Sequence, residues 1–98
     1  MIKVSVLYKG NIDDKFDVDY YQNSHLPMVK ETVGAAIKSV ELNVGLGDSP
    51  FKAIGNITFE SMAEFKNEFL PHMPKFRADV PNYTNIEPMI QISEIRAV

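Results

Sequence analysis

The amino-acid sequence predicts an α+β fold of the ferredoxin-like type, in which two helices and an antiparallel four-stranded sheet follow in the order βαββαβ. Four segments alternate apolar and polar residues as half-buried strands do, and two others repeat apolar residues at the spacing of an amphipathic helix. A chain of 98 residues holds one hydrophobic core at most, and a hydrophobic share of 45% is ample for that core. We therefore expect a single domain over residues 1–98.

The first strand and the first helix are predicted from residues 2–8 and 18–33. Apolar residues occupy every second position through most of 2–8, which is the strand repeat. Asp17 is a suitable N-cap for the helix, and Gly34 is a suitable end to it. Pro27 lies inside the helical pattern and removes one backbone hydrogen bond, so we expect the helix to kink at that point.

The remaining strands are predicted as a hairpin and a final strand. Residues 39–46 and 52–59 both show strand alternation, and the polar turn 47–50 between them suits an antiparallel hairpin. Residues 86–95 are predicted as the last strand. Pro88 is compatible with that strand, because it lies near the start, where a missing N–H does least harm.

The second helix is predicted to begin at Ser61, which forms a capping box with Glu64. Three apolar residues make its expected buried edge: Met62, Phe65 and Phe69. Pro71 and Pro74 are expected to end this helix, because proline cannot continue the helical hydrogen bonds. The segment 71–85 is then expected to be irregular.

Charge and composition exclude several classes of protein. The net charge is −3 and no run of like charges exceeds a pair, so nothing favours nucleic acid or an anionic membrane as a partner. The absence of cysteine excludes disulfides, thiolate nucleophiles and cysteine-ligated metal centres. Residues 1–8 lack the features of a signal peptide, and no segment approaches the roughly 20 apolar residues of a membrane span. We expect a cytoplasmic protein.

His25 is the residue from which we expect any chemistry to start. At about 100° per residue, it falls near the centre of the apolar stripe of the first helix, one turn after Tyr21. A buried imidazole must find partners or stay neutral, and histidine is easily tuned for proton transfer near neutral pH. We expect His25, as base or hydrogen-bond partner, to share a cavity with Tyr21, whose hydroxyl polarises a ligand oxygen. The alternatives are a structural histidine bonded to a strand carbonyl and an ordinary core tyrosine.

Four further residues are candidates for ligand contact. His72 follows the second helix and is a candidate for the same cavity, with a surface position as the alternative. Asn82 and Tyr83 offer polar groups on a segment that can close the cavity mouth, with plain turn formation as the alternative. Tyr20 points about 100° away from Tyr21 around the helix, so packing at the surface or in an interface is expected for it.

The sequence contains no motif for a cofactor or a metal. Gly45-x-Gly47 joins two strands and opens no helix, so it is not a dinucleotide-binding fingerprint. The two histidines, His25 and His72, have neither the His-x-x-x-His nor the His-x-x-Glu spacing of a metal site. We therefore expect no cofactor and no metal.

The predicted fold leaves one face of the sheet uncovered, because two helices cover only the other face. The open face is expected to hold apolar groups as well as serine and asparagine, a composition that favours contact with another surface. Self-association is the simplest solution, since a two-fold axis needs only one self-complementary surface. We expect a homodimer formed through the sheet faces.

Two stretches carry a resemblance to a known family. Residues 16–29 read Phe-Asp-Val-Asp-Tyr-Tyr-Gln-Asn-Ser-His-Leu-Pro-Met-Val, and residues 78–88 read Ala-Asp-Val-Pro-Asn-Tyr-Thr-Asn-Ile-Glu-Pro. The chain resembles the EthD-like family of the dimeric α+β barrel superfamily, and the Tyr-Tyr-x-x-x-His-x-Pro core is the specific part. The resemblance implies two ferredoxin-like units packed sheet to sheet, with a cavity between helices and sheet in each. Four motif positions carry over: Tyr20, Tyr21, His25 and Pro27.

The resemblance also implies the binding of a small molecule, with an apolar or phenolic compound as the expected ligand. One expectation is a cofactor-independent oxidoreductase or reductase-type enzyme that acts on such a compound in a degradation pathway. The alternative is a non-catalytic accessory or binding protein of such a pathway. The fold does not choose between them, since one fold hosts many activities.

Overall fold

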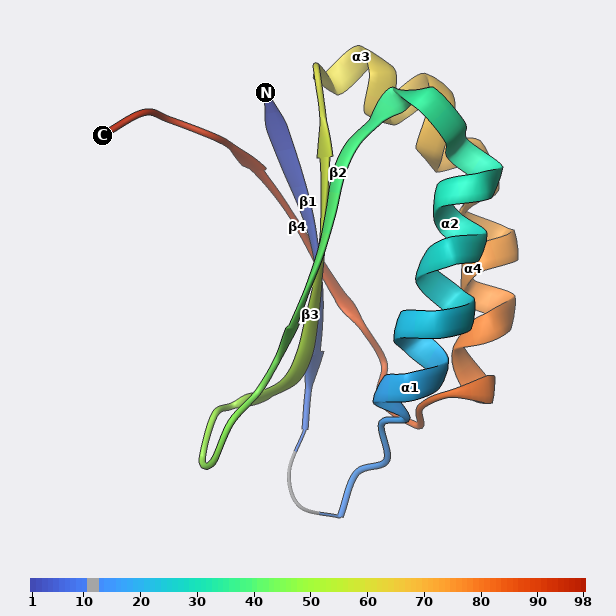
Figure 1. Cartoon of the computed structure of the whole chain (residues 1–98), viewed down its shortest axis with the longest axis vertical. Coiled ribbons are helices and arrows are strands. Elements are labelled where there is room, and N and C mark those ends of the chain that lie inside the picture. Colours follow the sequence, from blue (N-terminus) through green and yellow to red (C-terminus); the bar gives the residue numbers. More distant parts are fainter. Residues whose placement is uncertain (11–12) are drawn as a thin grey trace.

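The computed structural model describes residues 1–10 and 13–98. All strand pairs are antiparallel, and they form one sheet with the order β2-β3-β1-β4. The strands are β1 (Ile2–Lys9), β2 (Ile37–Val44), β3 (Phe51–Phe59) and β4 (Met89–Glu94). Two helical runs pack on one face of the sheet, and the other face is uncovered (Figure 1). The predicted βαββαβ order and ferredoxin-like class are confirmed.

The first helical run contains a π turn. It consists of α1 (Val18–Tyr20), the π turn η1 (Tyr21–His25), α2 (Leu26–Val33) and the short 3-10 turn η2 (Gly34–Ala36). Asp17 caps it as predicted and accepts a hydrogen bond from the backbone N–H of Tyr20 at 3.0 Å. In the π turn, the backbone N–H of Leu26 bonds the Tyr21 carbonyl. Pro27 then lies in the first turn of α2, where no N–H donor is needed, so the predicted disturbance takes the form of a π turn.

The second helical run is longer than predicted and reaches Asn82. It consists of α3 (Met62–Glu64), η3 (Phe65–Phe69), η4 (Leu70–His72), α4 (Met73–Asp79) and η5 (Val80–Asn82). The prediction that Pro71 and Pro74 end the helix, with an irregular segment over 71–85, is wrong. Each proline instead lies in the first turn of a new helical segment. In the described part of the chain, none of the helical segments has the length and apolarity needed to cross a bilayer.

At the start of the second helical run, the predicted cap is present, but one of the predicted core residues is not buried. The Ser61 hydroxyl accepts a hydrogen bond from the backbone N–H of Glu64 at 3.3 Å, which confirms the cap. Phe65 and Phe69 are buried as predicted, whereas Met62 is 38% exposed. The buried stripe of this run therefore begins with Phe65, one turn after the cap.

The strand boundaries differ most from the prediction in β2 and β4. β2 begins at Ile37 and ends before Leu46, which is 82% exposed in the hairpin loop. The hairpin loop lies away from the helical layer (Figure 1), in agreement with this exposure. β4 begins only at Met89, because Ile86 packs into the core and its N–H bonds the Thr84 hydroxyl at 3.0 Å.

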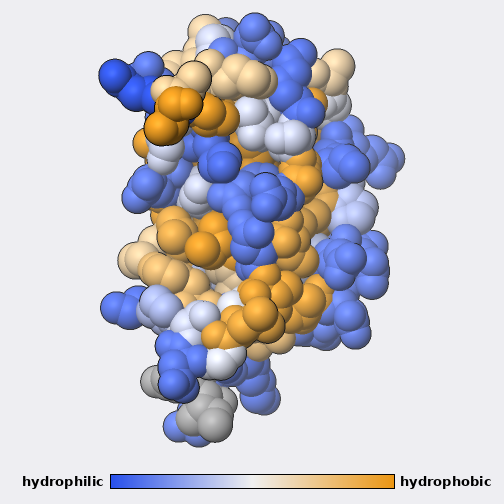
Figure 2. Space-filling model, turned by 60° about the vertical axis from the view of Figure 1, so that its left-hand side comes forward, coloured by the Kyte–Doolittle hydropathy of each residue, from blue (hydrophilic) through white to orange (hydrophobic). Residues whose placement is uncertain are grey.

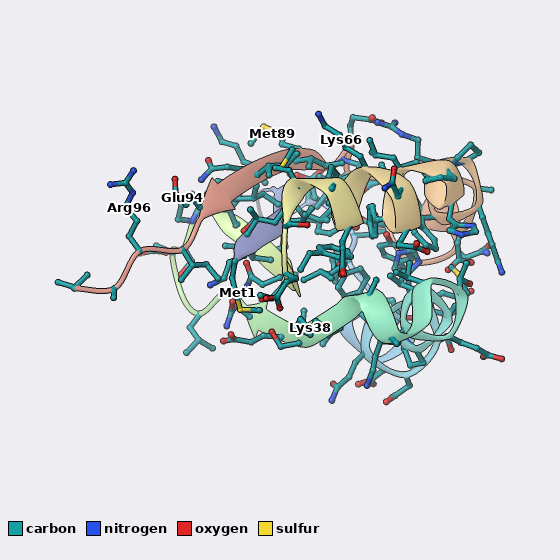
Figure 3. All side chains as sticks on the ribbon, turned by 90° about the horizontal axis from the view of Figure 1, so that it is seen from above. Met1, Lys38, Lys66, Met89, Glu94 and Arg96 are labelled. Carbon is teal, nitrogen blue, oxygen red and sulfur yellow. The ribbon has the colours of Figure 1, made fainter. Side chains whose placement is uncertain are left out.

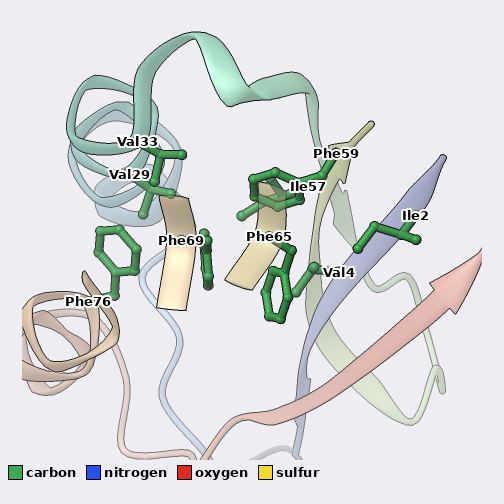
Figure 4. Packing of buried hydrophobic residues seen from close by; sticks show 9 residues of the cluster. All are labelled: Ile2, Val4, Val29, Val33, Ile57, Phe59, Phe65, Phe69 and Phe76. Atoms are coloured by element: carbon green, nitrogen blue, oxygen red, sulfur yellow. The ribbon is translucent and has the colours of Figure 1, made fainter. Parts of the chain in front are cut away.

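The core between the helices and the sheet consists of two clusters of side chains, which fill the space seen from above in Figure 3. The first cluster is aliphatic and phenylalanine-rich (Figure 4): Ile2, Val4, Val29, Val33, Ile57, Phe59, Phe65, Phe69 and Phe76. The second, which we call the aromatic cluster, lies toward the end of β1 and the start of the first helical run: Tyr8, Tyr21, Leu26, Ala53, Tyr83 and Ile86. The aromatic cluster positions the candidate site.

The uncovered face of the sheet is mixed in polarity. The pairing register places Ser5 opposite Asn56 and Leu7 opposite Ile54 on this face. Ser5 Oγ donates to Asn56 Oδ1 at 2.8 Å, and Asn56 Nδ2 donates to Asn43 Oδ1 on the neighbouring strand. Figure 2, which turns this side forward, shows hydrophobic and hydrophilic residues intermingled. The expected composition of apolar groups with serine and asparagine is confirmed.

Candidate functional site

A cavity lies between the helical layer and the sheet, beside the aromatic cluster. Its walls are mostly apolar and come from β1, β3, β4 and both helical runs. The residues of the lining that carry polar groups on their side chains are Tyr8, Tyr21, His25, Arg77 and Tyr83. The free space is about 40 Å³, which is room for about one water molecule, so a larger ligand requires the walls to move.

His25 presents one ring nitrogen to a carboxylate and leaves the other without a protein partner. The residue is 5% exposed, and its Nδ1 lies 2.8 Å from Oδ2 of Asp79 at the end of α4. Because an ionised carboxylate only accepts hydrogen bonds, the proton of the neutral ring must be on Nδ1. Nε2 bonds no protein atom among the described residues, and the ring lines the cavity. The lone pair of Nε2 is thus available to a molecule in the cavity.

Asp79 is held in place by three hydrogen-bond donors. Oδ2 accepts from His25, and Oδ1 accepts from the Tyr20 hydroxyl at 2.8 Å and from the Asn82 amide at 2.9 Å. Burial raises the pKa of Asp79, but these hydrogen bonds outweigh burial and hold the pKa below its ordinary value. Asp79 is therefore ionised at neutral pH and orients the imidazole.

The protonation state of His25 follows from its surroundings. Burial lowers the pKa of His25, and the hydrogen bond and negative charge of Asp79 oppose only part of this effect. The net shift is downward from the ordinary value of 6.5, so the imidazole is neutral at pH 7. A neutral imidazole with a fixed tautomer is the form that accepts a proton at Nε2.

Two tyrosines of the aromatic cluster contact the imidazole, and the third, Tyr8, packs against both of them. The ring of Tyr21 stacks on His25 with 5.2 Å between centroids, and the centroid of Tyr83 lies 4.8 Å from that of His25. The hydroxyls of Tyr8 and Tyr83 share a hydrogen bond of 2.7 Å. Burial is the largest cause that raises the pKa of each of the three phenols. The phenols therefore stay protonated and serve as hydrogen-bonding groups.

The sheet makes room for the aromatic cluster at Gly55 in β3. A Cβ at Gly55 would overlap the Tyr21 hydroxyl and lie 3.2 Å from Cζ of the same ring. The second helical run is tied to the first nearby, because the carbonyl of Tyr83 accepts a hydrogen bond from the N–H of Asp17 at 2.8 Å. The sheet and both helical runs thus meet at the same side chains.

The structure separates the candidate residues predicted from the sequence. Three of them line the cavity: Tyr21, His25 and Tyr83. Two lie outside its lining and bind Asp79 instead: Tyr20 and Asn82. His72 is half-buried beside Phe76, with 6.3 Å between ring centroids, and does not reach this cavity. The alternative of a bond from His25 to a strand carbonyl is not found in the described chain, since its partner is Asp79.

Sequence reasoning missed Asp79 and Arg77, because both lie in the segment that was predicted to be irregular. Asp79 is separated from His25 by 54 positions, so no local spacing connects the two. One signal for a continued helix was present, since Phe69, Phe76 and Tyr83 recur every seven residues. That repeat predicts a helix that continues through α4, and such a helix would place Asp79 near the first helix.

The fold and the site define a ferredoxin-like α+β protein with a histidine-bearing cavity between its helices and its sheet. The chain is similar to the crystal structure of an EthD-like protein from Ralstonia eutropha, with a TM-score of 0.87 and 34% sequence identity. The match covers 95% of this chain and 89% of that chain. This chain belongs to the EthD-like family.

More distant structures share the fold. An ethyl tert-butyl ether D (EthD) family protein from Bacillus halodurans matches with a TM-score of 0.75 and 14% identity, over 98% of this chain and 99% of that chain. A dimeric protein of unknown function and ferredoxin-like fold from Bacteroides fragilis matches with a TM-score of 0.55 and 15% identity, over 96% and 95%. No family model and no curated protein matches the chain.

Proposed function

We propose that this chain binds a small apolar organic molecule in the cavity and that His25 removes a proton from it. The observation that supports the proposal is His25, whose ring lines the cavity and whose Nε2 has no protein partner in the described chain. The neutral ring and its orientation by Asp79 favour a role as proton acceptor. The mostly apolar walls favour an apolar body on the ligand.

The proton transfer needs only groups of the site and the ligand. The Nε2 lone pair takes a proton from an acidic O–H or C–H bond of the ligand, and the electron pair of that bond stays on the ligand as an anion. The Asp79 carboxylate, 2.8 Å from Nδ1, stabilises the imidazolium that forms. The Tyr21 hydroxyl would donate a hydrogen bond to the oxygen on which charge develops. Return of the proton restores the neutral ring.

The family resemblance favours an oxidoreductase, for which this deprotonation would be the first step, since the resulting anion is the electron-rich form of the ligand. The alternative is an accessory protein that holds the same ligand without turnover. Both versions use the same cavity and the same bond to Nε2 of His25. They differ in whether a proton is exchanged, and that difference can be measured.

Ligand entry depends on the cavity walls, because the free space of about 40 Å³ is too small for an organic molecule. Two side chains of the lining are well placed to move. Met73 is half-buried and unbranched, and Ile90 on the edge strand β4 is 41% exposed. Displacement of these two side chains is the smallest change that widens the cavity.

Phenylacetone is a suitable probe, because it is small and apolar and carries acidic C–H bonds beside a carbonyl. Binding is measured by NMR titration, and proton removal by the uptake of deuterium at its benzylic carbon. We expect His25→Gln to stay folded and to reduce catalysed uptake by roughly 100-fold or more, the usual contribution of a general base. His72→Gln is the matched control and should leave uptake unchanged, since His72 does not reach the cavity.

The outcomes separate the two versions of the function. Binding with deuterium uptake no faster than in buffer would favour the accessory protein over the enzyme. Uptake that survives His25→Gln would refute His25 as the base. A wild-type chain that binds no phenylacetone at millimolar concentration would contradict the proposed binding site itself.

We further propose that the chain forms a homodimer, as a dimeric α+β barrel, through the uncovered face of the sheet. The open face in Figure 1 and the half-buried Leu7 and Ile54 on it support the proposal, as does the similar fold of the dimeric protein from Bacteroides fragilis. Such an interface should bury on the order of 2,000 Å². Sedimentation at micromolar concentration should show a dimer that Ile54→Glu dissociates. Lys66→Glu, in η3 of the helical layer on the opposite side of the sheet, should leave the dimer intact. A wild-type monomer would refute the proposal.

A further inference from the structure

Arg77 is the one permanently charged side chain in the described lining of the cavity. It lies in α4, and its Nη1 is 3.4 Å from Oε1 of Glu87, just before β4. Pro88 and Ile90 line the cavity beside it. Arg77 therefore borders the cavity on its solvent side, whereas His25 is almost fully buried.

The charged residues of α4 point to two different sides of the helix. Lys75 Nζ donates to Thr32 Oγ1 at 3.1 Å, and Asp79 bonds His25 at 2.8 Å, so both face the first helical run. Arg77 lies two residues from each of them and points toward β4, as the turn of a helix requires. The base and the cation therefore approach the cavity from different sides of α4.

The present partner of Arg77 is loosely held. The side chains of Arg77 and Glu87 are 59% and 83% exposed, and their closest N···O distance is 3.4 Å. An ion pair with this exposure is screened by solvent and contributes little. A ligand carboxylate at the cavity mouth could displace Glu87, and the apolar walls beside it would strengthen the new pair by excluding water.

We infer that the cavity selects an apolar molecule that carries a carboxylate, with the apolar body between helices and sheet and the carboxylate paired with Arg77. The inference rests on the proposed binding function and adds the chemical class of the ligand. A guanidinium matches a carboxylate with two parallel hydrogen bonds, and the described lining of the cavity contains no acidic side chain. Arg77 is thus a specificity-determining residue, and His25 faces the apolar body.

Two probes of matched shape test the inference. Phenylacetate and phenylacetamide differ in charge and hardly in size, and their affinities are compared by NMR titration at pH 7.5 and low salt. The wild-type chain should bind phenylacetate about tenfold more tightly, as expected for a charge-assisted pair. Arg77→Gln should abolish this preference without weakening phenylacetamide. Added salt should reduce the wild-type preference.

Arg96→Gln is the matched control. Arg96 also forms an exposed pair with a glutamate, with Nη2 3.5 Å from Oε2 of Glu94, and it lies on the C-terminal segment away from the helices (Figure 3). This control removes one positive charge away from the cavity, so it should keep the tenfold preference. A preference that Arg96→Gln also abolishes would show that net charge, and not Arg77, selects the ligand.

The results distinguish failure of this inference from failure of the proposed function. If phenylacetone binds but phenylacetate binds no better than phenylacetamide, the binding function stands and the inference is wrong. If Arg77→Gln keeps the preference, the inference is also wrong. If none of the three probes binds, the proposed function fails and the inference fails with it.

Discussion

Replacement of Gly55 by alanine should test how tightly the aromatic cluster is held. The added Cβ would overlap the Tyr21 hydroxyl and lie 3.2 Å from Cζ and 3.4 Å from Cε2 of that ring. Tyr21 cannot turn aside, because it is 1% exposed and its ring packs against Tyr8 and Phe16, with centroids 5.4 Å and 5.2 Å away. The methyl group must therefore displace either the ring or the strand.

The magnitude follows from two opposing effects. Overpacking of a filled core costs about 1–3 kcal/mol, whereas alanine gains about 0.5–1 kcal/mol over glycine inside a strand. The net loss for Gly55→Ala should be about 1–2 kcal/mol. Tyr21→Phe alone should cost about 1 kcal/mol, the usual value of a buried hydrogen bond, because it removes the bond between the Tyr21 and Tyr8 hydroxyls. Because Tyr21→Phe removes the overlapping atom, the double variant should be hardly less stable than Tyr21→Phe alone.

The assay is urea denaturation followed by circular dichroism, at one protein concentration so that self-association does not change between variants. The double-mutant cycle should give a coupling energy of about 1 kcal/mol between the two sites. Additive losses, or a Gly55→Ala variant as stable as the wild type, would refute the close approach of Tyr21 to β3.

Three further predictions concern the cap and the ionisable pair. Ser61→Ala should lower the free energy of unfolding by about 1 kcal/mol, and an unchanged urea midpoint would show that the second run starts elsewhere. Because the pKa of His25 is lowered on folding, the unfolded chain takes up the proton first, so stability should be complete above pH 6.5 and decline below it. His25→Gln should flatten this slope below pH 6.5 in urea denaturation. Asp79→Asn should lower the pKa of His25 further, which an NMR titration can follow; a rise would contradict the assigned pair.

The elements that the sequence predicted well are those with strong local signals. Strand alternation in 2–8 and the caps at Asp17 and Ser61 depend on neighbours in the chain, and the structure has them. The errors at Pro71 and Pro74 have one cause. Proline lacks a backbone N–H, so it ends a helix only at a position where the helix requires that donor. In the first turn of a new segment the N–H is not required, and packing of the next turn on the sheet continues the run.

The candidate site was predicted only in part, for a similar reason. Helical periodicity placed Tyr21 and His25 on the buried face, and both line the cavity. The carboxylate beside the imidazole comes from Asp79, which only the packing of two helices against each other brings near. Periodicity within one helix cannot reveal a partner on another. Arg77 was missed likewise, because its place at the cavity depends on the position of α4 relative to β4.

The aromatic cluster also makes the site visible to spectroscopy without any label. The chain has four tyrosines and no tryptophan. All four tyrosines belong to this neighbourhood: Tyr8, Tyr21 and Tyr83 line the cavity, and Tyr20 bonds Asp79. The intrinsic near-ultraviolet absorption and emission of the protein therefore arise mainly beside His25. A molecule that enters the cavity would change the surroundings of most of the chromophores at once, so ordinary tyrosine fluorescence can report occupancy in crude ligand screens.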